Sequence, residues 1–453
     1  MQETLSRPSQ SLVMPLSEFL PALFRALDGE GVPFCVLRNY EGFPIYNTGR
    51  DIDFLICASD LPLAIRALRS IHGIRIVGYS KRRYVANIFL QGVSASPESR
   101  ALQVDFDLSL TWKGLAYLPA DVVLQAAIPR SKGNSAFFVP SPVHESITSL
   151  LTSLIVGGSL KEKYFPQVQR TFASERSGVI AALLPQFGAK VATRLADSVI
   201  DGDREKVLDC VRALRTSLLL RNLLRRPLRS ALAVVRHYAS EVALRYSPNT
   251  LETVCILSSV SCGRTALIDA LIPILQYSAV VVEKRYSRPQ LSPWRDPSRK
   301  NINADLDVET RAGGLVSMAK IVQWVVGEWL SQLKKDFTLR IADNQSYDLI
   351  VAAEWRCYGI PKWFARLMGK LLPAPDLWIL LDQETDRMQV ESQEVLSAQM
   401  HRQLEACRSF VKTRNRYAIL DADNPAASVT EEAYSAIIDM LALRTEMRLK
   451  NRF

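Results

Sequence analysis

The stretch LETVCILSSVSCGRTALIDAL, at residues 251–271, places an apolar strand, a short loop and a helix in direct succession. Its first half is the kind of run that a strand covered on both faces produces. Comparable runs follow at SAVVVEK (278–284), YDLIVAAE (347–354), PDLWILLD (375–382) and RYAILDA (416–422), and helical patterns separate them. Apolar strands that alternate with helices predict an α/β fold here, a doubly wound domain built on a parallel sheet.

The first 140 residues have a different pattern, which predicts a small α/β domain with a mixed sheet. A helical pattern at 17–28 precedes strand-like segments at 34–40 and 51–57, and a second helical pattern follows at 60–71. Three β-rich segments come next, at 75–80, 82–91 and 101–110.

Helical periodicity replaces the strand signals from Pro140 to about Arg245. Ser, Pro and Asn in YSPNT (246–250) then predict a linker. We therefore expect three parts, an α/β domain at 1–140, an all-helical part at 141–249 and the doubly wound domain at 250–453.

Composition places the chain in the ordinary globular class. Of its 453 residues, 48% are hydrophobic and 23% are charged, which excludes collagen-like and disordered chains. Seven scattered cysteines without CxxC spacing favour a reducing compartment and do not form a zinc-ribbon pattern. The sequence has no secretory signal pattern and no run near the roughly 18 apolar residues of a membrane span. We expect a cytoplasmic protein.

Most of the formal net charge of +10 lies in one segment, residues 212–245. This segment has eight arginines and one acidic residue, and Pro227 is expected to divide it into two helices with an apolar face. A solvated basic face packed on neighbouring helices is the favoured interpretation, and no nucleic-acid module accompanies it. The alternative is attachment to anionic lipid at the inner membrane surface through Arg221, Arg225, Arg226 and Arg229.

Two pairs of aspartates lie on the strand-like segments of the first domain. Asp51 and Asp53 are two residues apart, so both side chains leave the same face of their strand. Asp105 and Asp107 repeat this spacing on a later strand. Three converging carboxylates can hold two Mg²⁺ ions around a phosphoryl group, and an unpaired buried carboxylate is costly. We expect Asp51, Asp53 and either Asp105 or Asp107 to form a metal site; the alternative is solvent-facing aspartates at strand ends.

These residues resemble the nucleotidyltransferase fold over about residues 15–165. GRDIDFLI (49–56) is similar to its central strand, and QVDFDL (103–108) is similar to the strand that bears the third carboxylate. The resemblance implies Mg²⁺-dependent transfer of a nucleotidyl group from ATP or another NTP to an acceptor hydroxyl on a sugar, glycan intermediate or protein. Asp51, Asp53 and Asp105 would then be the catalytic metal ligands.

The segment LRNYEG (37–42) stands where that family has a Gly-Ser pair that holds the triphosphate. This variant resembles a bacterial branch found among surface-polysaccharide genes. Arg38 and Asn39 are the residues expected to bind phosphate in its place. Lys161 and Lys163 are expected at a solvated helix end, with contact to a triphosphate as the alternative.

The loop in the opening stretch resembles a P-loop, GxxxxGK[ST], with two changes. Gly263 and Thr265 are kept, Ser258 takes the place of the first glycine, and Arg264 replaces the lysine. In a P-loop the backbone N–H groups and the lysine hold phosphates, and the hydroxyl holds Mg²⁺. Gly263, Arg264 and Thr265 are therefore nucleotide-binding candidates, with Thr265 the expected Mg²⁺ ligand. A planar guanidinium is not equivalent to a compact ammonium.

The same domain resembles thymidylate kinase over about residues 250–445. Arg288 and Glu354 occupy acceptor-site positions of that family, while Trp355 stands where it has an arginine. The lid segment at 386–395 carries Arg387 as its one basic residue. These changes affect groups that stabilise charge during phosphoryl transfer. The resemblance implies a kinase fold that transfers phosphate weakly or not at all.

Two further functions remain open for the chain. One is a nucleotide or small-molecule kinase that uses Arg264 and Thr265. The other is a non-catalytic scaffold that binds nucleotide at the inner membrane surface.

Overall fold

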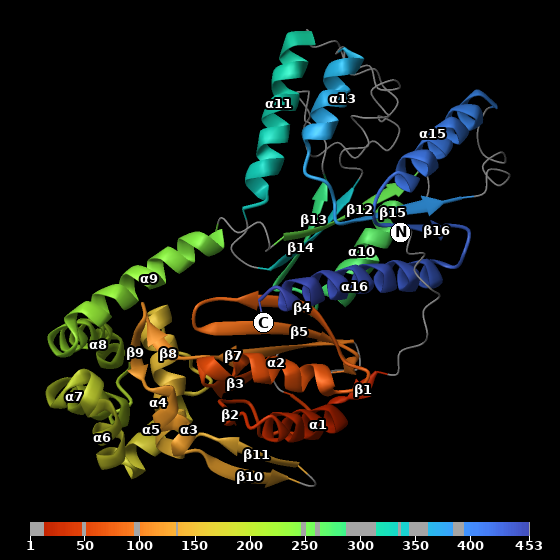
Figure 1. Cartoon of the computed structure of the whole chain (residues 1–453). Coiled ribbons are helices and arrows are strands. Elements are labelled where there is room, and N and C mark those ends of the chain that lie inside the picture. The colour runs from red at the N-terminus through yellow and green to blue at the C-terminus, as the bar shows by residue number, and fades with distance from the viewer. Residues whose placement is uncertain are drawn as a thin grey trace. The chain divides into compact units, whose positions relative to one another are not determined.

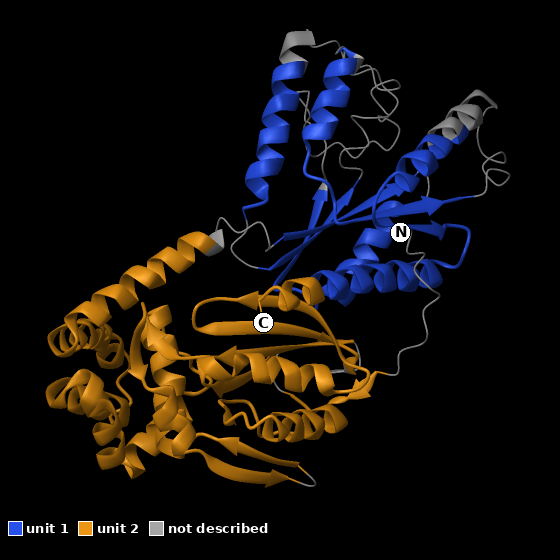
Figure 2. Ribbon diagram, in the orientation of Figure 1, with its two compact units in different colours: residues 1–10, 245–444 blue, residues 11–244, 445–453 orange. Residues whose placement is uncertain are grey.

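The computed structural model describes residues 13–47, 51–94, 100–132, 135–245, 251–258, 263–286, 314–333, 337–343, 361–383 and 394–452. The chain divides into unit 1, residues 1–10 and 245–444, and unit 2, residues 11–244 and 445–453 (Figure 2). Both units are α/β, with a mixed sheet in unit 2 and an all-parallel sheet in unit 1. The predicted fold class is confirmed at this level.

The mixed sheet of unit 2 has the strand order β2-β3-β7-β5-β4 (Figure 1). β3 and β7 are parallel neighbours, and every other pair in this sheet is antiparallel. The elements up to β7 are β1 (Met14–Pro15), α1 (Leu16–Gly29), β2 (Phe34–Val36), β3 (Asp51–Ile56), η1 (Ala58–Asp60), α2 (Leu61–Ser70), β4 (Arg75–Lys81), β5 (Val85–Gln91), β6 (Val93–Ser94) and β7 (Ala101–Asp107).

The alternation along β3 decides which face of the sheet is apolar. Ile52, Phe54 and Ile56 lie in a core with α1 and α2, so these two helices cover that face. Successive side chains of a strand point to opposite faces, so Asp51 and Asp53 lie on the other one. The predicted pattern of the first domain is confirmed, except that β2 ends at Val36 instead of residue 40.

A second core of unit 2 joins short strands and a helical region. Its elements are β8 (Leu110–Trp112), β9 (Leu115–Leu118), α3 (Ala120–Gln125), β10 (Ile128–Lys132), β11 (Ser135–Val139), α4 (Pro142–Leu151), η2 (Thr152–Gly157), α5 (Phe165–Ser174), α6 (Arg176–Phe187), α7 (Ala189–Ile200), α8 (Arg204–Arg225) and α9 (Pro227–Arg245). The described residues from Pro142 to Arg245 are helical apart from short connections, as predicted. Pro227 begins α9 directly after α8 has ended, which confirms the predicted division.

The parallel sheet of unit 1 has the order β13-β14-β12-β15-β16, with β12 in the centre. The elements of this unit are β12 (Leu251–Ser258), α10 (Arg264–Leu275), β13 (Val281–Tyr286), α11 (Gly314–Ser331), β14 (Thr338–Asp343), α13 (Lys362–Leu371), β15 (Leu377–Asp382), α15 (Glu394–Lys412), β16 (Tyr417–Asp421) and α16 (Ala426–Lys450). The last residues of α16 belong to unit 2, where Leu449 joins the first core.

Two elements of unit 1 were not predicted, namely β14 and α16. The strand expected at 347–354 and the linker expected at 246–250 lie outside the described residues. β14 was missed because it contains Arg340 and Asp343, which are 0% and 5% exposed although both are charged. Arg340 is buried with Glu283 and Glu328 as ion-pair partners from β13 and α11. In the described part of the chain, no helix is both long and apolar enough to cross a membrane.

A candidate metal centre on adjacent strands

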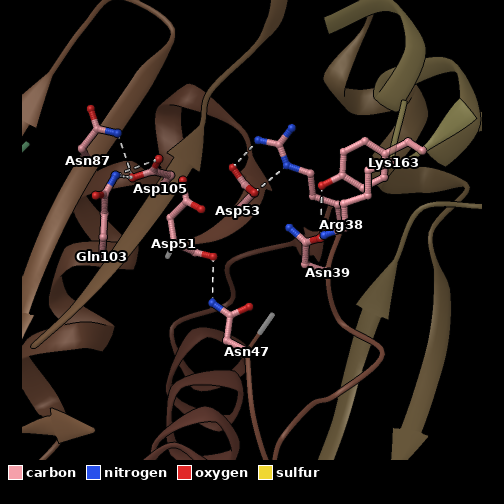
Figure 3. A network of polar contacts seen from close by, with 10 residues as sticks. Arg38, Asn39, Asn47, Asp51, Asp53, Asn87, Gln103, Asp105 and Lys163 are labelled. Carbon is pink, nitrogen blue, oxygen red and sulfur yellow. Dashed lines mark hydrogen bonds and ion pairs between the residues drawn. The ribbon is translucent and has the colours of Figure 1, made fainter. Parts of the chain in front are cut away.

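Three carboxylates of unit 2 converge on one site (Figure 3). In the pairing of β3 with β7, Asp53 lies opposite Asp105, and Asp51 lies opposite Gln103. One ligand oxygen from each of Asp51, Asp53 and Asp105 lies within 4.8 Å of the other two. The prediction that the two Asp-x-Asp strands lie side by side is therefore confirmed. The geometry favours Asp105 over Asp107 as the third carboxylate, since Asp107 lies further along β7, opposite Leu55.

Burial makes this concentration of negative charge unfavourable without a cation. Asp53 is 3% exposed and Asp105 is 9% exposed. Burial raises the pKa of Asp105 from 3.8 to about 6, against the lowering effect of its hydrogen bonds to Asn87 and Gln103. Burial and the charge of Asp53 raise the pKa of Asp107 to about 8. A hard divalent cation fits this set, because it prefers carboxylate oxygens and compensates their charge.

Two side-chain amides hold Asp105 in position. Asn87 Nδ2 donates to Asp105 Oδ1 over 2.7 Å, and Gln103 Nε2 donates to Oδ1 and Oδ2 over 2.9 and 3.2 Å. Asn87 lies opposite Asp105 in the pairing of β5 with β7. Neither amide was predicted from the sequence to belong to the site. In the sequence each of them is a polar residue within an apolar strand. Only the register of β5 against β7, however, shows that Asn87 lies next to Asp105.

Arg38 lies against the cluster of carboxylates and is paired with Asp53. Its Nε and Nη2 donate to Asp53 Oδ2 and Oδ1 over 2.6 and 2.7 Å, so the ion pair is bidentate. The Arg38 side chain is 25% exposed and that of Asp53 is 4% exposed. The hydrogen bond to Asp53 raises the pKa of Arg38, so the guanidinium stays charged. Arg38 thus neutralises one carboxylate of the site.

Asn39 connects the loop after β2 to the segment before α5. It has a positive φ of 59°, a conformation that asparagine tolerates better than most residues. Its Oδ1 accepts hydrogen bonds from Lys163 Nζ and Tyr164 Oη, both over 3.1 Å. Lys163 is exposed in the turn before α5, and its ammonium lies beside Asn39 of the segment LRNYEG (37–42) (Figure 3). Asn47 Nδ2 donates to the backbone oxygen of Asp51 over 2.9 Å.

The predicted phosphate loop of unit 1 is described from Gly263 onward. Gly263 has a positive φ of 63°, and Arg264 and the exposed Thr265 begin α10. Arg264 Nε lies 2.7 Å from Oδ1 of Asp343, at side-chain exposures of 14% and 6%. Asp343 is the last residue of β14 and lies opposite Ile256 of β12. Neither this carboxylate nor its strand was predicted from the sequence.

The remaining candidates of unit 1 lie outside the described residues. These are Arg288, Glu354, Trp355 and Arg387. Their predicted roles stay predictions.

No protein-family model and no curated protein matches this chain.

Proposed function

We propose that unit 2 is a Mg²⁺-dependent nucleotidyltransferase, which moves a nucleotidyl group from an NTP to an acceptor hydroxyl. The observation that carries the proposal is the convergence of Asp51, Asp53 and Asp105 from two adjacent strands within 4.8 Å. The resemblance of GRDIDFLI and QVDFDL to the nucleotidyltransferase fold supplies the reaction class. The acceptor is proposed to be a sugar, a glycan intermediate or a protein. The resemblance of LRNYEG (37–42) to a bacterial branch found among surface-polysaccharide genes favours a role in surface-polysaccharide biosynthesis.

Each polar group of the site has a part in this reaction. Asp51, Asp53 and Asp105 would hold the metal, which would supply charge neutralisation for the phosphate and would lower the pKa of the attacking hydroxyl. Asn87 and Gln103 fix the rotamer of Asp105 through their hydrogen bonds. Arg38 neutralises Asp53, and Lys163 presents an exposed ammonium beside Asn39, where it can attract phosphate.

Unit 1 is proposed to be a thymidylate kinase-like fold in which phosphoryl transfer is weak or absent. The strand before the predicted P-loop, β12, is the centre of a parallel sheet, as a P-loop fold requires. Arg264, which stands where a P-loop has its lysine, is paired with Asp343. The negative charge of Asp343 offsets the positive charge of Arg264, so the pair attracts a phosphate less strongly than a free guanidinium would. This argues against the kinase alternative.

The test is label transfer from each α-labelled NTP, or release of pyrophosphate, with Mg²⁺. Asp51→Asn combined with Asp53→Asn should lower the rate by at least about 1000-fold, because metal binding supplies several kcal/mol of stabilisation. The matched control replaces two exposed aspartates of the same unit, Asp28→Asn with Asp209→Asn, and should keep the rate. An unchanged rate in the first double variant refutes the assignment.

Two further measurements separate the alternatives. Calorimetric titration with Mg²⁺ and an NTP tests the site without an acceptor, and the Asp51 and Asp53 double variant should lose the Mg²⁺ signal. Transfer from γ-labelled ATP to dTMP or simple sugars that is lost in Arg264→Ala would establish the kinase alternative instead.

A further inference from the structure

The outward face of α9 is apolar and exposed, whereas the sequence predicts that the apolar side of this segment packs on neighbouring helices. Leu228 is 85% exposed, Val235 62% and Val242 56%, and Leu232 and Tyr238 are close to half exposed. The exposed apolar residues of this helix recur at helical spacing, so they form one stripe. We call it the α9 outer face, and it consists of Leu228, Ala231, Leu232, Val235, Tyr238, Ala239 and Val242.

Contacts on the opposite side of α9 fix this orientation. Ser230 is buried, and its hydroxyl donates to the backbone oxygen of Asn222 over 2.8 Å. The ring of His237 stacks on Tyr84 with centroids 6.0 Å apart. A side chain at Gly114 would come within 2.6 Å of the backbone oxygen of Ala233, so the strand hairpin and the helix approach closely. The outer face is therefore turned away from unit 2.

The arginines of this segment divide into two groups. Arg225 donates to the backbone oxygen of Pro185 over 2.8 Å, and Arg221 packs beside Gly188, so these two attach α8 to α6 and α7. Arg226, Arg229 and Arg236 are exposed. Arg229 and Arg236 are seven residues apart, so they lie on the same side of α9, two turns from each other, at the border of the outer face.

We propose that the α9 outer face lies in the surface of an anionic lipid bilayer. An interfacial helix buries an apolar face below the headgroups while basic side chains at its border contact lipid phosphates. Charge complementarity favours this occupant, because the exposed Arg229 and Arg236 border the outer face and the exposed Arg226 directly precedes α9. The sole acidic residue of α9, Glu241, lies off this face. A protein partner would need to bury these arginines against carboxylates of its own.

The charge requirement is tested with the full-length protein in vesicle flotation. Wild type should bind vesicles that contain phosphatidylglycerol and should not bind phosphatidylcholine alone. Neutralising three arginines should weaken binding by about 100-fold, since each basic residue at an anionic surface contributes about 1 kcal/mol. The variant combines Arg226→Gln, Arg229→Gln and Arg236→Gln.

A matched control removes three positive charges from exposed sites elsewhere in unit 2. It should bind within about threefold of wild type, because charges beyond a Debye length contribute little. The control combines Arg25→Gln, Arg170→Gln and Lys190→Gln. Equal losses in the two variants, or equal wild-type binding to neutral vesicles, would overturn the proposal.

The apolar requirement separates insertion from simple charge attraction. Leu228→Gln with Leu232→Gln and Val235→Gln should weaken binding by at least about tenfold, because burial of these side chains is lost. The control replaces exposed apolar residues elsewhere in unit 2, Val156→Gln with Leu184→Gln and Leu208→Gln, and should bind as wild type does. If wild type instead forms a dimer that the α9 variant dissociates and neither binds vesicles, the face is an interface between copies and the proposal is wrong.

Discussion

Arg38 forms a bidentate ion pair with Asp53, with Nε 2.6 Å from Oδ2 and Nη2 2.7 Å from Oδ1. Asp53 is also one of the three carboxylates of the candidate metal centre. The guanidinium and a metal ion bound there would therefore compensate the same buried charge.

Arg38→Ala should consequently destabilise the metal-free protein by about 2 kcal/mol, because a buried carboxylate loses its partner. Mg²⁺ should restore most of this loss, since the cation takes over the compensation. Urea unfolding with and without Mg²⁺ measures both effects. Arg66→Ala, which removes an exposed ion pair to Glu30, should change stability by less than about 0.5 kcal/mol and should not respond to Mg²⁺. A loss at Arg38 that Mg²⁺ leaves unchanged would contradict the shared-charge interpretation.

The raised pKa values of Asp105 and Asp107 predict that the metal-free protein loses stability as the pH rises. The ordinary pKa of 3.8 applies to the unfolded chain, whereas the folded values are about 6 and about 8. Between these limits the folded state binds more protons than the unfolded state, so the free energy of unfolding falls with rising pH. The expected slope is roughly 2 kcal/mol per pH unit between pH 5 and pH 6, where both groups contribute, and roughly 1 kcal/mol per pH unit between pH 7 and pH 8.

Urea unfolding at pH 5.5, 6.5 and 8 checks this slope. Saturating Mg²⁺ should flatten it, because the bound cation favours the ionised carboxylates. Asp107→Asn should abolish the pH dependence of stability at the high-pH end, near pH 7 to 8, since the amide does not titrate. Stability that rises from pH 5.5 to 8 in the absence of metal would show that these carboxylates are ionised without cost.

Asn87 is predicted to act on Mg²⁺ affinity through Asp105. Its hydrogen bond lowers the pKa of Asp105, so Asn87→Ala should raise that pKa and weaken Mg²⁺ binding by about tenfold. The loss should be larger at pH 6 than at pH 8, because protons compete with the metal at the lower pH. Calorimetric titration at both pH values measures it. Gln167→Ala, which removes an exposed amide bonded to Glu145, should bind as wild type does.

The sequence was sufficient for the parts of this fold that depend on periodicity. A spacing of two placed Asp51 and Asp53 on one face of β3, because alternation along a strand needs no knowledge of its neighbours. It was not sufficient for Asn87, whose role follows from the register of β5 against β7. Nor was it sufficient for the ion pair of Arg38 with Asp53, because a sequence displays a charge without its partner.

Two other failures arise from partners that are distant in sequence. The sequence of β14 does not predict a buried strand, because it contains Arg340. In the fold, Glu283 and Glu328 from two other elements compensate the charge of this arginine. The apolar residues of α9 predicted a packed face, because a helix buried against protein and one exposed at the surface have the same spacing. In both cases the outcome depends on which residues, or none, pack against the residue in the folded protein, and the local sequence does not contain this information.

The ion pair between Arg264 and Asp343 should contribute to the stability of unit 1, as the proposal of weak or absent phosphoryl transfer in this unit implies. Arg264→Ala and Asp343→Ala should each destabilise the protein by about 3 kcal/mol, because each leaves an uncompensated, nearly buried charge. The double variant should lose less than the sum, with a coupling energy of about 1 to 3 kcal/mol. Urea unfolding of the four proteins measures this cycle, and pyrophosphate release by unit 2 should remain unchanged in all of them. Additive losses would mean that the two charges do not stabilise each other, and Arg264 would then be available to bind a phosphate.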